Sequence, residues 1–303
     1  ENKFGSMTGP WLCGDSGTAE EGLLLDLVVY YNFVKGFAFS TITGYLYAIR
    51  WVHLAHGYAD PLLNKPRLTL ARRALKHVSG SPRGKLPASP DMLRWIWGEL
   101  DLSTDFGIFL WGAVMLAFFY LLRSSEYAPS QGHFDVARAL LKGDVTFFRE
   151  GASEADCKRA DEVVICIRQS KTDQHKVGVL RNSYLTGEML CPVASAAAIM
   201  CRLDERGARD DEPFFSYAPG KTIDRTHVSA YLKKAASALG QSEADFAPHS
   251  LRIGGASCML ACGYSEEMIR RQGRWHSFCW RRYAYDAREQ MQGVARAMAT
   301  STY

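Results

Sequence analysis

The stretch PHSLRIGGASCMLACGYSEEMIRRQGRWHSFCWRRYAYDA, residues 248–287, joins an apolar, glycine-rich helical pattern to an unusual set of polar and aromatic side chains. His249 and Arg252 are three residues apart, so they share one face of a helix. The apolar segment that follows them indicates that their end of this helix is anchored in a core. Trp275, Tyr283 and Tyr285 complete the series. A buried histidine with a satisfied hydrogen bond would explain His249 alone, but the combination indicates chemistry.

A second polar pair follows the most apolar segment of the chain. FGIFLWGAVMLAFFYLL, residues 106–122, carries no charge and reaches only the lower limit of a membrane span. It contains two glycines and runs directly into RSSE, so we interpret it as a buried core helix. Arg123 and Glu126 then stand three residues apart, which would place them on one helix face. Either they form a simple ion pair at a helix end or they belong to a site.

Composition and charge fit a globular protein with two domains. The chain has 303 residues, of which 47% are hydrophobic and 22% charged. The net charge is only +4, and the excess lies in residues 1–86, which hold ten basic and six acidic residues. Residues 61–90 contain seven basic residues and no acid. Such a run can follow a phosphate backbone or form a solvated helix face, and both interpretations are open.

The eight cysteines are scattered and contain no CxxC pair. Cys258 and Cys262 are one helical turn apart, without a second ligand pair nearby. This pattern argues against zinc and against a secreted disulfide framework, and it favours reduced thiols in an intracellular protein. We therefore expect no metal site. The first ten residues, ENKFGSMTGP, resemble a disordered cloning remnant, and no signal peptide is expected.

The pattern of elements predicts a mainly α fold with a small antiparallel β-sheet. A helix is expected over 40–57, with Ser40 as its N-cap and Gly57 as its stop, and another over 68–78. SGSPRGKLPASP, residues 79–90, is the best linker, and Ser89 should cap the next helix. Strands are expected over 144–148, 162–169 and 176–180, with SKTDQH as a hairpin tip. The predicted parts are a helical domain over 1–80, a linker over 81–88 and an α+β domain over 89–303.

These residue types suit phosphoryl transfer without a metal. Two arginines offer planar, permanently charged forks for phosphate oxygens. A histidine and a tryptophan N–H can add donors, and a lysine on a hairpin tip can reach a leaving oxygen. A tyrosine can attack phosphorus. Together they supply charge stabilisation, an acid and a nucleophile.

The motifs RSSE, SKTDQ, HSLR, GRWHS and WRRYAYD resemble, in this order and context, those of tyrosine recombinases, the phage-integrase family. The GRW and RRY motifs are most similar to those of recombinases of DIRS-like and Crypton-like eukaryotic mobile elements. The resemblance covers residues from about 20 to 290. Each motif alone is weak, but five in order are specific. The resemblance implies an N-terminal core-binding (SAM-like) helical domain followed by an α+β tyrosine-recombinase catalytic domain.

The resemblance also implies roles for individual residues. Arg123 matches the first catalytic arginine, and Glu126 matches the acidic residue that supports it. Lys171 matches the hairpin lysine that protonates the leaving 5′ oxygen. The remaining matches are the H-x-x-R pair His249 and Arg252, and Trp275 as a donor to the scissile phosphate.

The nucleophile is one of two tyrosines. The mobile-element pattern places it eight residues after Trp275, which gives Tyr283. The bacterial and phage spacing of nine reaches Tyr285 when it is counted from His276. We expect Tyr283, with Tyr285 as the alternative. The residues expected to contact DNA are Lys65, Arg67, Arg72, Arg73, Lys85, Arg281 and Arg282.

The implied reaction breaks one DNA strand, leaves a 3′-phosphotyrosine and a free 5′ hydroxyl, and rejoins the strand without a cofactor. The expected partners are double-stranded DNA and further copies of the chain, as a tetramer on DNA and a monomer when free. No membrane is expected, and the protein would be nuclear in a eukaryotic host. The alternatives are a type IB-like topoisomerase and a domesticated DNA-binding protein. An intact residue set argues against the last of these.

Overall fold

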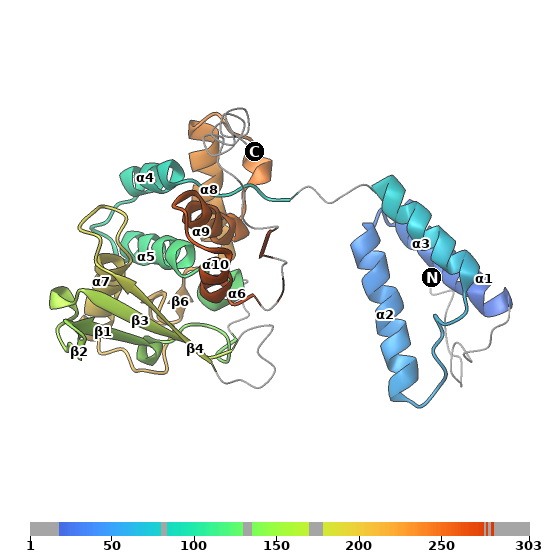
Figure 1. Cartoon of the computed structure of the whole chain (residues 1–303), viewed down its shortest axis with the longest axis horizontal. Helices are drawn as coiled ribbons and strands as arrows, with labels where there is room; N and C mark the ends of the chain where they lie inside the picture. The colour runs from blue at the N-terminus through green and yellow to red at the C-terminus, as the bar shows by residue number, and fades with distance from the viewer. Residues whose placement is uncertain are drawn as a thin grey trace, which may run out of the picture. The chain divides into compact units, whose positions relative to one another are not determined.

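In a computed structural model of the chain, the described residues are 18–79, 84–129, 135–169, 178–275, 277, 280 and 281. The chain divides into two compact units, residues 1–83 and 84–303 (Figure 1). Leu86 and Ala88, in the segment expected as a linker, are hydrogen-bonded into the second unit. Their N–H groups donate to the carbonyls of Asp245 and Ser250 at 2.8 and 2.9 Å.

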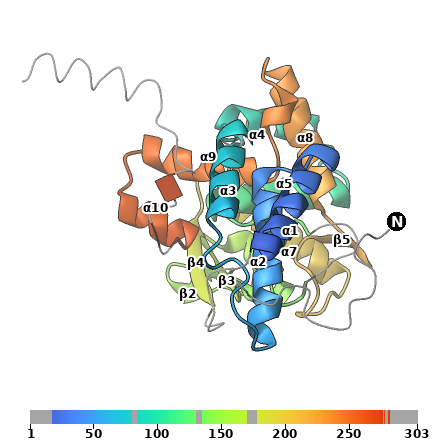
Figure 2. The ribbon, with the colours of Figure 1, turned by 90° about the vertical axis from the view of Figure 1, so that its right-hand side faces the viewer.

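The first unit is a small helical bundle. It consists of α1 (Thr18–Val29), a π-helical turn (Tyr30–Val34), α2 (Phe39–Ala55) and α3 (Pro66–Ser79). The helix α3 packs against both α1 and α2, and Figure 2 shows the three side by side. Leucine, isoleucine and valine side chains from all three form one core, which consists of Leu24, Leu27, Val28, Ile42, Leu46, Leu68 and Leu75.

The expected N-cap of α2 was wrong by two residues. The helix begins at Phe39, so Ser40 lies inside it and does not cap it. The N-cap is Ala38, whose extended backbone lets its carbonyl accept from the N–H groups of Thr41 and Ile42 at 3.0 and 3.1 Å. The expected stop is confirmed, because Gly57 adopts the left-handed conformation that follows a helix end.

The second unit is built around one buried helix. α4 (Pro90–Glu99) begins as predicted, since the Ser89 side chain accepts from the Met92 N–H at 3.2 Å. α5 (Asp105–Phe119) is buried along nearly its whole length, which confirms the interpretation as a core helix. Of the helices in the described part of the chain, none combines the length and hydropathy that crossing a bilayer requires.

A four-stranded antiparallel sheet lies in the second unit, in the order β2-β1-β3-β4. Its strands are β1 (Val145–Arg149), β2 (Ala152–Ser153), β3 (Glu162–Ile167) and β4 (Val179–Tyr184). The expected third strand, 176–180, was therefore placed too early. β4 pairs with all of β3, from Ile167 opposite Val179 to Glu162 opposite Tyr184. The extent of β4 could not be predicted from its polar residues, because an edge strand can expose polar side chains and so lacks a clear strand pattern.

The remaining elements enclose the core of the second unit. The helix α7 (Pro192–Glu205) packs between α5 and the sheet, while α9 (His249–Ala261) packs on α5 (Figure 1). α8 (Arg225–Ala238) packs on α4, and α10 (Glu266–Gly273) packs on α9. A short hairpin, β5 (Ser216–Ala218) and β6 (Lys221–Thr222), precedes α8. The observed fold class is the predicted one: mainly helical, with a small antiparallel sheet.

Candidate active site

The turn after α5 places the first polar pair. The chain leaves α5 at Tyr120 and passes through Leu121, which has a positive φ of 49°. Arg123 then becomes the N-cap of the short helix α6 (Ser124–Tyr127). Glu126 accepts from the Arg123 backbone N–H at 2.8 Å and from the Arg123 Nη1 at 3.2 Å. The pair is in contact as expected, but the contact is made across the start of a new helix and not along the apolar one.

Two tyrosine hydroxyls fix this turn to the rest of the unit. The Tyr120 hydroxyl donates to the Val163 carbonyl in β3 at 2.7 Å. The Tyr127 hydroxyl donates to the Pro248 carbonyl at 2.9 Å, directly before α9. Burial raises the pKa of both phenols well above their usual range, so both remain donors. The Arg123 turn is thereby held against the sheet on one side and the start of α9 on the other.

Paired glycines bring the second polar pair close to the first. A Cβ atom on Gly255 would lie 2.1 Å from the Phe118 carbonyl in α5, and one on Gly254 would lie 2.1 Å from the Ala88 carbonyl. Only glycine permits so close an approach of two backbones. Gly255 therefore lets α9 pack closely on α5, and Gly254 lets it pack closely on the segment before α4. This packing brings Arg252 to the turn that holds Arg123.

Arg252 is the most deeply placed member of the site, with 2% of its surface exposed. Its guanidinium donates from Nη1 to the Leu121 carbonyl and from Nη2 to the Gly273 carbonyl, the latter at 2.5 Å. It also stacks on the Trp275 ring, 4.4 Å from the ring centroid. A Cβ on Gly273 would lie 1.8 Å from this ring, so the glycine allows Trp275 to fold back over the arginine.

His249 is half-buried at the first position of α9. Burial lowers its pKa, and the positive charges of Arg252 and Arg123 lower it further. The neutral imidazole is therefore favoured near neutral pH, and a neutral imidazole can accept a proton.

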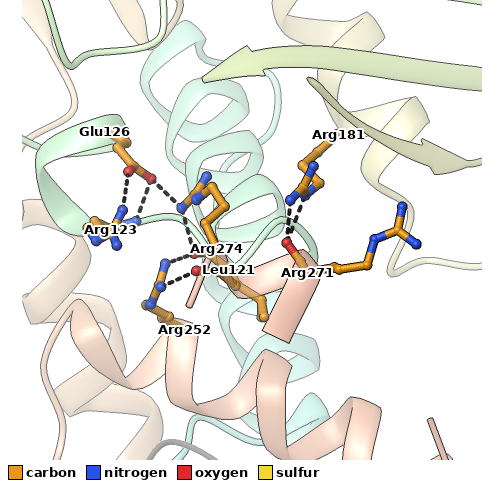
Figure 3. Close-up of polar contacts among 8 residues, drawn as sticks. Leu121, Arg123, Glu126, Arg181, Arg252, Arg271 and Arg274 are labelled. Atoms are coloured by element: carbon orange, nitrogen blue, oxygen red, sulfur yellow. Dashed lines mark hydrogen bonds and ion pairs between the residues drawn. The ribbon is translucent and has the colours of Figure 1, made fainter. Parts of the chain in front are cut away.

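Arg274 is a member of this cluster that the sequence did not reveal. It adopts a left-handed conformation directly after α10, and its side chain is 3% exposed. Its Nη2 contacts the Glu126 carboxylate at 2.8 Å and the Leu121 carbonyl at 3.2 Å (Figure 3). The residue lies inside the GRWHS motif, but nothing in the local spacing indicates that it turns inward.

A further arginine connects the sheet to this cluster. Arg181 of β4 donates from Nε to the Arg271 carbonyl at 3.0 Å, at the end of α10 (Figure 3). Burial lowers the pKa of Arg181, and the neighbouring charge of Arg271 lowers it further. The contact holds the strand that follows the expected hairpin tip against the helix that precedes Trp275.

The structure thus brings together five of the predicted catalytic residues: Arg123, Glu126, His249, Arg252 and Trp275. The expected general acid, Lys171, and both candidate nucleophiles, Tyr283 and Tyr285, lie outside the described residues, as does Arg282. No group of metal-ligating side chains is found within the described ranges.

The residues expected to contact DNA differ in their surroundings. Lys65 does not fit that expectation, because it is 2% exposed and its Nζ is 3.1 Å from the Glu20 carboxylate. Glu20 precedes the acid-free run by some forty residues, so no local pattern indicates this pairing. Arg67 and Arg73 are exposed on α3, and Arg72 lies over the Tyr47 ring. In the second unit, the Lys85 Nζ donates to the Ala244 carbonyl, and the exposed Arg281 lies 3.4 Å from Glu266.

No family model matches the sequence, and no curated protein matches it. Solved structures share its fold. The XerH site-specific recombinase in a post-cleavage complex with its difH substrate aligns with a TM-score of 0.61 at 13% identity, over 92% of this chain and 72% of that one.

Two other solved structures align over most of their length. A lambda integrase (75-356) dimer bound to a COC′ core site has a TM-score of 0.54 at 16% identity, over 94% of this chain and 84% of that one. The Tn1549 transposon integrase with circular intermediate DNA has a TM-score of 0.52 at 11% identity, over 98% and 89%. The fold of the chain is therefore that of tyrosine recombinases.

Proposed function

We propose that this protein is a site-specific DNA recombinase or integrase that cuts and rejoins DNA strands through a 3′-phosphotyrosine. One observation carries the proposal. Arg252, which shares the helix α9 with His249, donates to the carbonyl of Leu121, two residues before Arg123, so residues more than a hundred positions apart in sequence come together on a fold shared with recombinases. A relation to DIRS-like or Crypton-like elements is part of the proposal and rests on the GRW and RRY motifs alone.

The proposed chemistry assigns the charges of the site to one phosphodiester. Arg123 and Arg252 stabilise the negative charge that grows on the non-bridging oxygens, an effect that is strong in a water-poor site. A phenol has a pKa of about 10, so the nucleophile, which we take to be Tyr283, must lose its proton as it attacks phosphorus. His249 accepts that proton. The 5′ oxygen leaves as the P–O bond breaks, and Lys171 protonates it.

The proposed partner is double-stranded DNA. The solved structures of similar fold hold a difH substrate, a COC′ core site and circular intermediate DNA. We assign the exposed arginines of α3, with Lys85, Arg281 and Arg282, to the DNA backbone. Assembly as a tetramer on DNA is part of the same proposal. We assign the contact between copies to an apolar stripe at spacings of three, one and three residues, Met291, Val294, Ala295 and Met298, which lies outside the described residues.

Covalent trapping tests the enzyme directly. The chain is incubated with a library of nicked duplexes of random sequence, in which cleavage releases a short fragment and prevents religation. Protein is then denatured, and DNA-linked peptides are identified by mass spectrometry. The expected adduct is on Tyr283. The variant Tyr283→Phe should bind DNA without forming it, and the matched control Tyr285→Phe should still form it.

The same experiment identifies the competing functions. An adduct on Tyr285 would reverse the choice of nucleophile, and the absence of an adduct on either tyrosine would leave a DNA-binding protein. Plasmid assays then separate the two enzymes. A recombinase should exchange strands between two copies of the trapped sequence, whereas a topoisomerase would relax any supercoiled plasmid and exchange nothing.

A further inference from the structure

The Glu126 carboxylate lies between two arginines that differ in burial. Arg274 reaches it from the interior, with a 2.8 Å contact between two side chains that are each 3% exposed. Arg123 reaches it from the outer side, with a 3.2 Å contact and a side chain that is 20% exposed. The inner contact is therefore the shorter and the better shielded of the two. Figure 3 shows both arginines reaching the same carboxylate.

Arg274 is poorly explained as a stabilising residue. Its Nε and Nη1 are buried and have no hydrogen-bond partner within the described residues. Unmatched buried donors and a desolvated charge both disfavour folding, and apolar residues often replace buried ion pairs without loss of stability. An arginine at this position therefore calls for a functional explanation.

The charges around Glu126 provide a functional explanation for Arg274. Two guanidinium groups, those of Arg123 and Arg274, contact the carboxylate of Glu126, and a third, that of Arg252, donates to the nearby Leu121 carbonyl, which also accepts from Arg274. Without Arg274, the outer arginine would be the nearest described cation for a carboxylate that is itself buried. A buried carboxylate binds its remaining cation strongly, because leaving it unpaired is costly.

We propose that Arg274 is a positioning residue, which neutralises Glu126 from the interior and so releases the Arg123 guanidinium to bind an anion. Glu126 keeps its bond to the Arg123 backbone N–H, so the turn stays in place while the side chain moves. That the anion is the scissile phosphodiester rests on the proposed function. The release of Arg123 by Arg274 does not.

The test measures how fast phenylglyoxal modifies Arg123 in the whole protein. This reagent modifies arginine side chains that are not held in an ion pair, and mass spectrometry of the Arg123 peptide follows the reaction. The variants are Arg274→Gln, Glu126→Gln and both together. In Glu126→Gln, the amide oxygen can still accept from the Arg123 N–H, but the charge that holds the guanidinium is gone. Arg271→Gln is the control, because it removes a positive charge from an exposed side chain at the same end of α10.

Arg274→Gln should slow the modification of Arg123 about tenfold, a change within the range of coupling energies for residues in contact. Arg271→Gln should leave it unchanged. Adding Glu126→Gln to Arg274→Gln should restore the wild-type rate or exceed it. An Arg274→Gln protein whose Arg123 reacts as fast as in the wild type would overturn the proposal.

If Arg274→Gln alone does not fold, a second comparison, between Glu126→Gln and the double variant, still tests the proposal. Because Arg274 acts only through the Glu126 charge, Arg123 should react equally in Glu126→Gln and in the double variant. A difference of more than about threefold between them, which exceeds the usual scatter of additive effects, would mean that Arg274 acts on Arg123 without Glu126 and would overturn the proposal.

Single-turnover cleavage at saturating DNA adds a functional readout. Arg274→Gln should slow adduct formation about tenfold with DNA affinity nearly unchanged, and the double variant should recover part of the loss. The two proposals can fail separately. If the wild-type protein forms no adduct but Arg123 shows the expected reactivities, the recombinase function is refuted and the positioning role of Arg274 stands. If the wild-type protein forms the adduct but Arg274→Gln does not change the reactivity of Arg123, the positioning role is refuted and the recombinase function stands.

Discussion

At the scale of single residues, the site depends on burying positive charge beside a histidine. Arg252 has almost no exposed surface, and two backbone carbonyls and an indole ring hold its guanidinium. Its planar fork can donate to two carbonyls at once, which a lysine ammonium does with less geometric control. Its charge acts on the site through an interior in which electrostatic interactions are strong.

The pKa of His249 provides a direct measure of this arrangement. An NMR titration of the free protein, with His249→Gln to identify the signal, should place its midpoint below the ordinary histidine value of about 6.5. Burial is the main cause, so Arg123→Gln should raise the midpoint only partly. A midpoint above 6.5 would contradict this prediction, because burial and the two positive charges all favour the neutral ring.

The same shift fixes the sign of the pH effect on stability. The folded protein binds the His249 proton less readily than the unfolded chain does. The contribution of neutral His249 to the free energy of unfolding is therefore complete above about pH 6.5 and is lost as the pH falls through the lowered pKa. If His249 accepts the tyrosine proton, the cleavage rate should fall in the same direction.

At the scale of elements, the contact between α9 and α5 determines whether the site forms. Gly255 allows the two backbones to meet, and a side chain there would overlap the Phe118 carbonyl. Because a carbonyl of a buried helix cannot yield as a flexible side chain can, the helix α9 itself would have to move.

Gly255→Ala should therefore lower the free energy of unfolding of the second unit by about 1–3 kcal/mol, the usual cost of overpacking. It should also slow cleavage, because it displaces His249 and Arg252 from Arg123. Denaturant unfolding and single-turnover cleavage measure the two effects.

The matched control is Gly44→Ala in α2, where an added Cβ meets nothing within 4 Å. Alanine is the better helix former, so this change should stabilise the first unit by about 0.5–1 kcal/mol. Equal effects of the two substitutions would show that α9 does not need its close approach to α5.

At the scale of the whole molecule, the two units divide the work of binding and chemistry in the proposed function. The cluster of catalytic candidates is contained in the second unit, while the acid-free basic run lies mainly in the first. Within that run the structure separates a buried lysine from exposed arginines, and the two kinds should respond differently to substitution.

Replacing Arg67 and Arg73 together by glutamine should weaken binding to every DNA sequence. Each phosphate contact contributes about 0.9 to the slope of log affinity against log salt, so the slope should become shallower by about 2. Lys65→Gln is the contrasting variant: it should leave the slope unchanged and destabilise the first unit, because it breaks a buried pair with Glu20. A slope altered by Lys65→Gln alone would place the lysine on the DNA and contradict its burial.

The sequence by itself determined the features that depend on near neighbours along the chain. The apolar run predicted the buried helix α5, and Ser89 and Pro90 predicted the start of α4. The short runs at 144–148 and 162–169 predicted β1 and β3 to within two residues at each end. The spacing of His249 and Arg252 placed them on one face of one helix. Helix and strand periods are properties of short segments, so these predictions needed no knowledge of the fold.

Only the tertiary structure decided which charges meet. Lys65 is buried against Glu20, and Arg274 reaches Glu126 from a helix end nearly a hundred and fifty residues later. The extent of β4 was likewise set by its partner β3 and not by its own polar sequence. Local spacing cannot predict such contacts, because the free energy of a buried charge depends on groups that only the folded chain brings within reach.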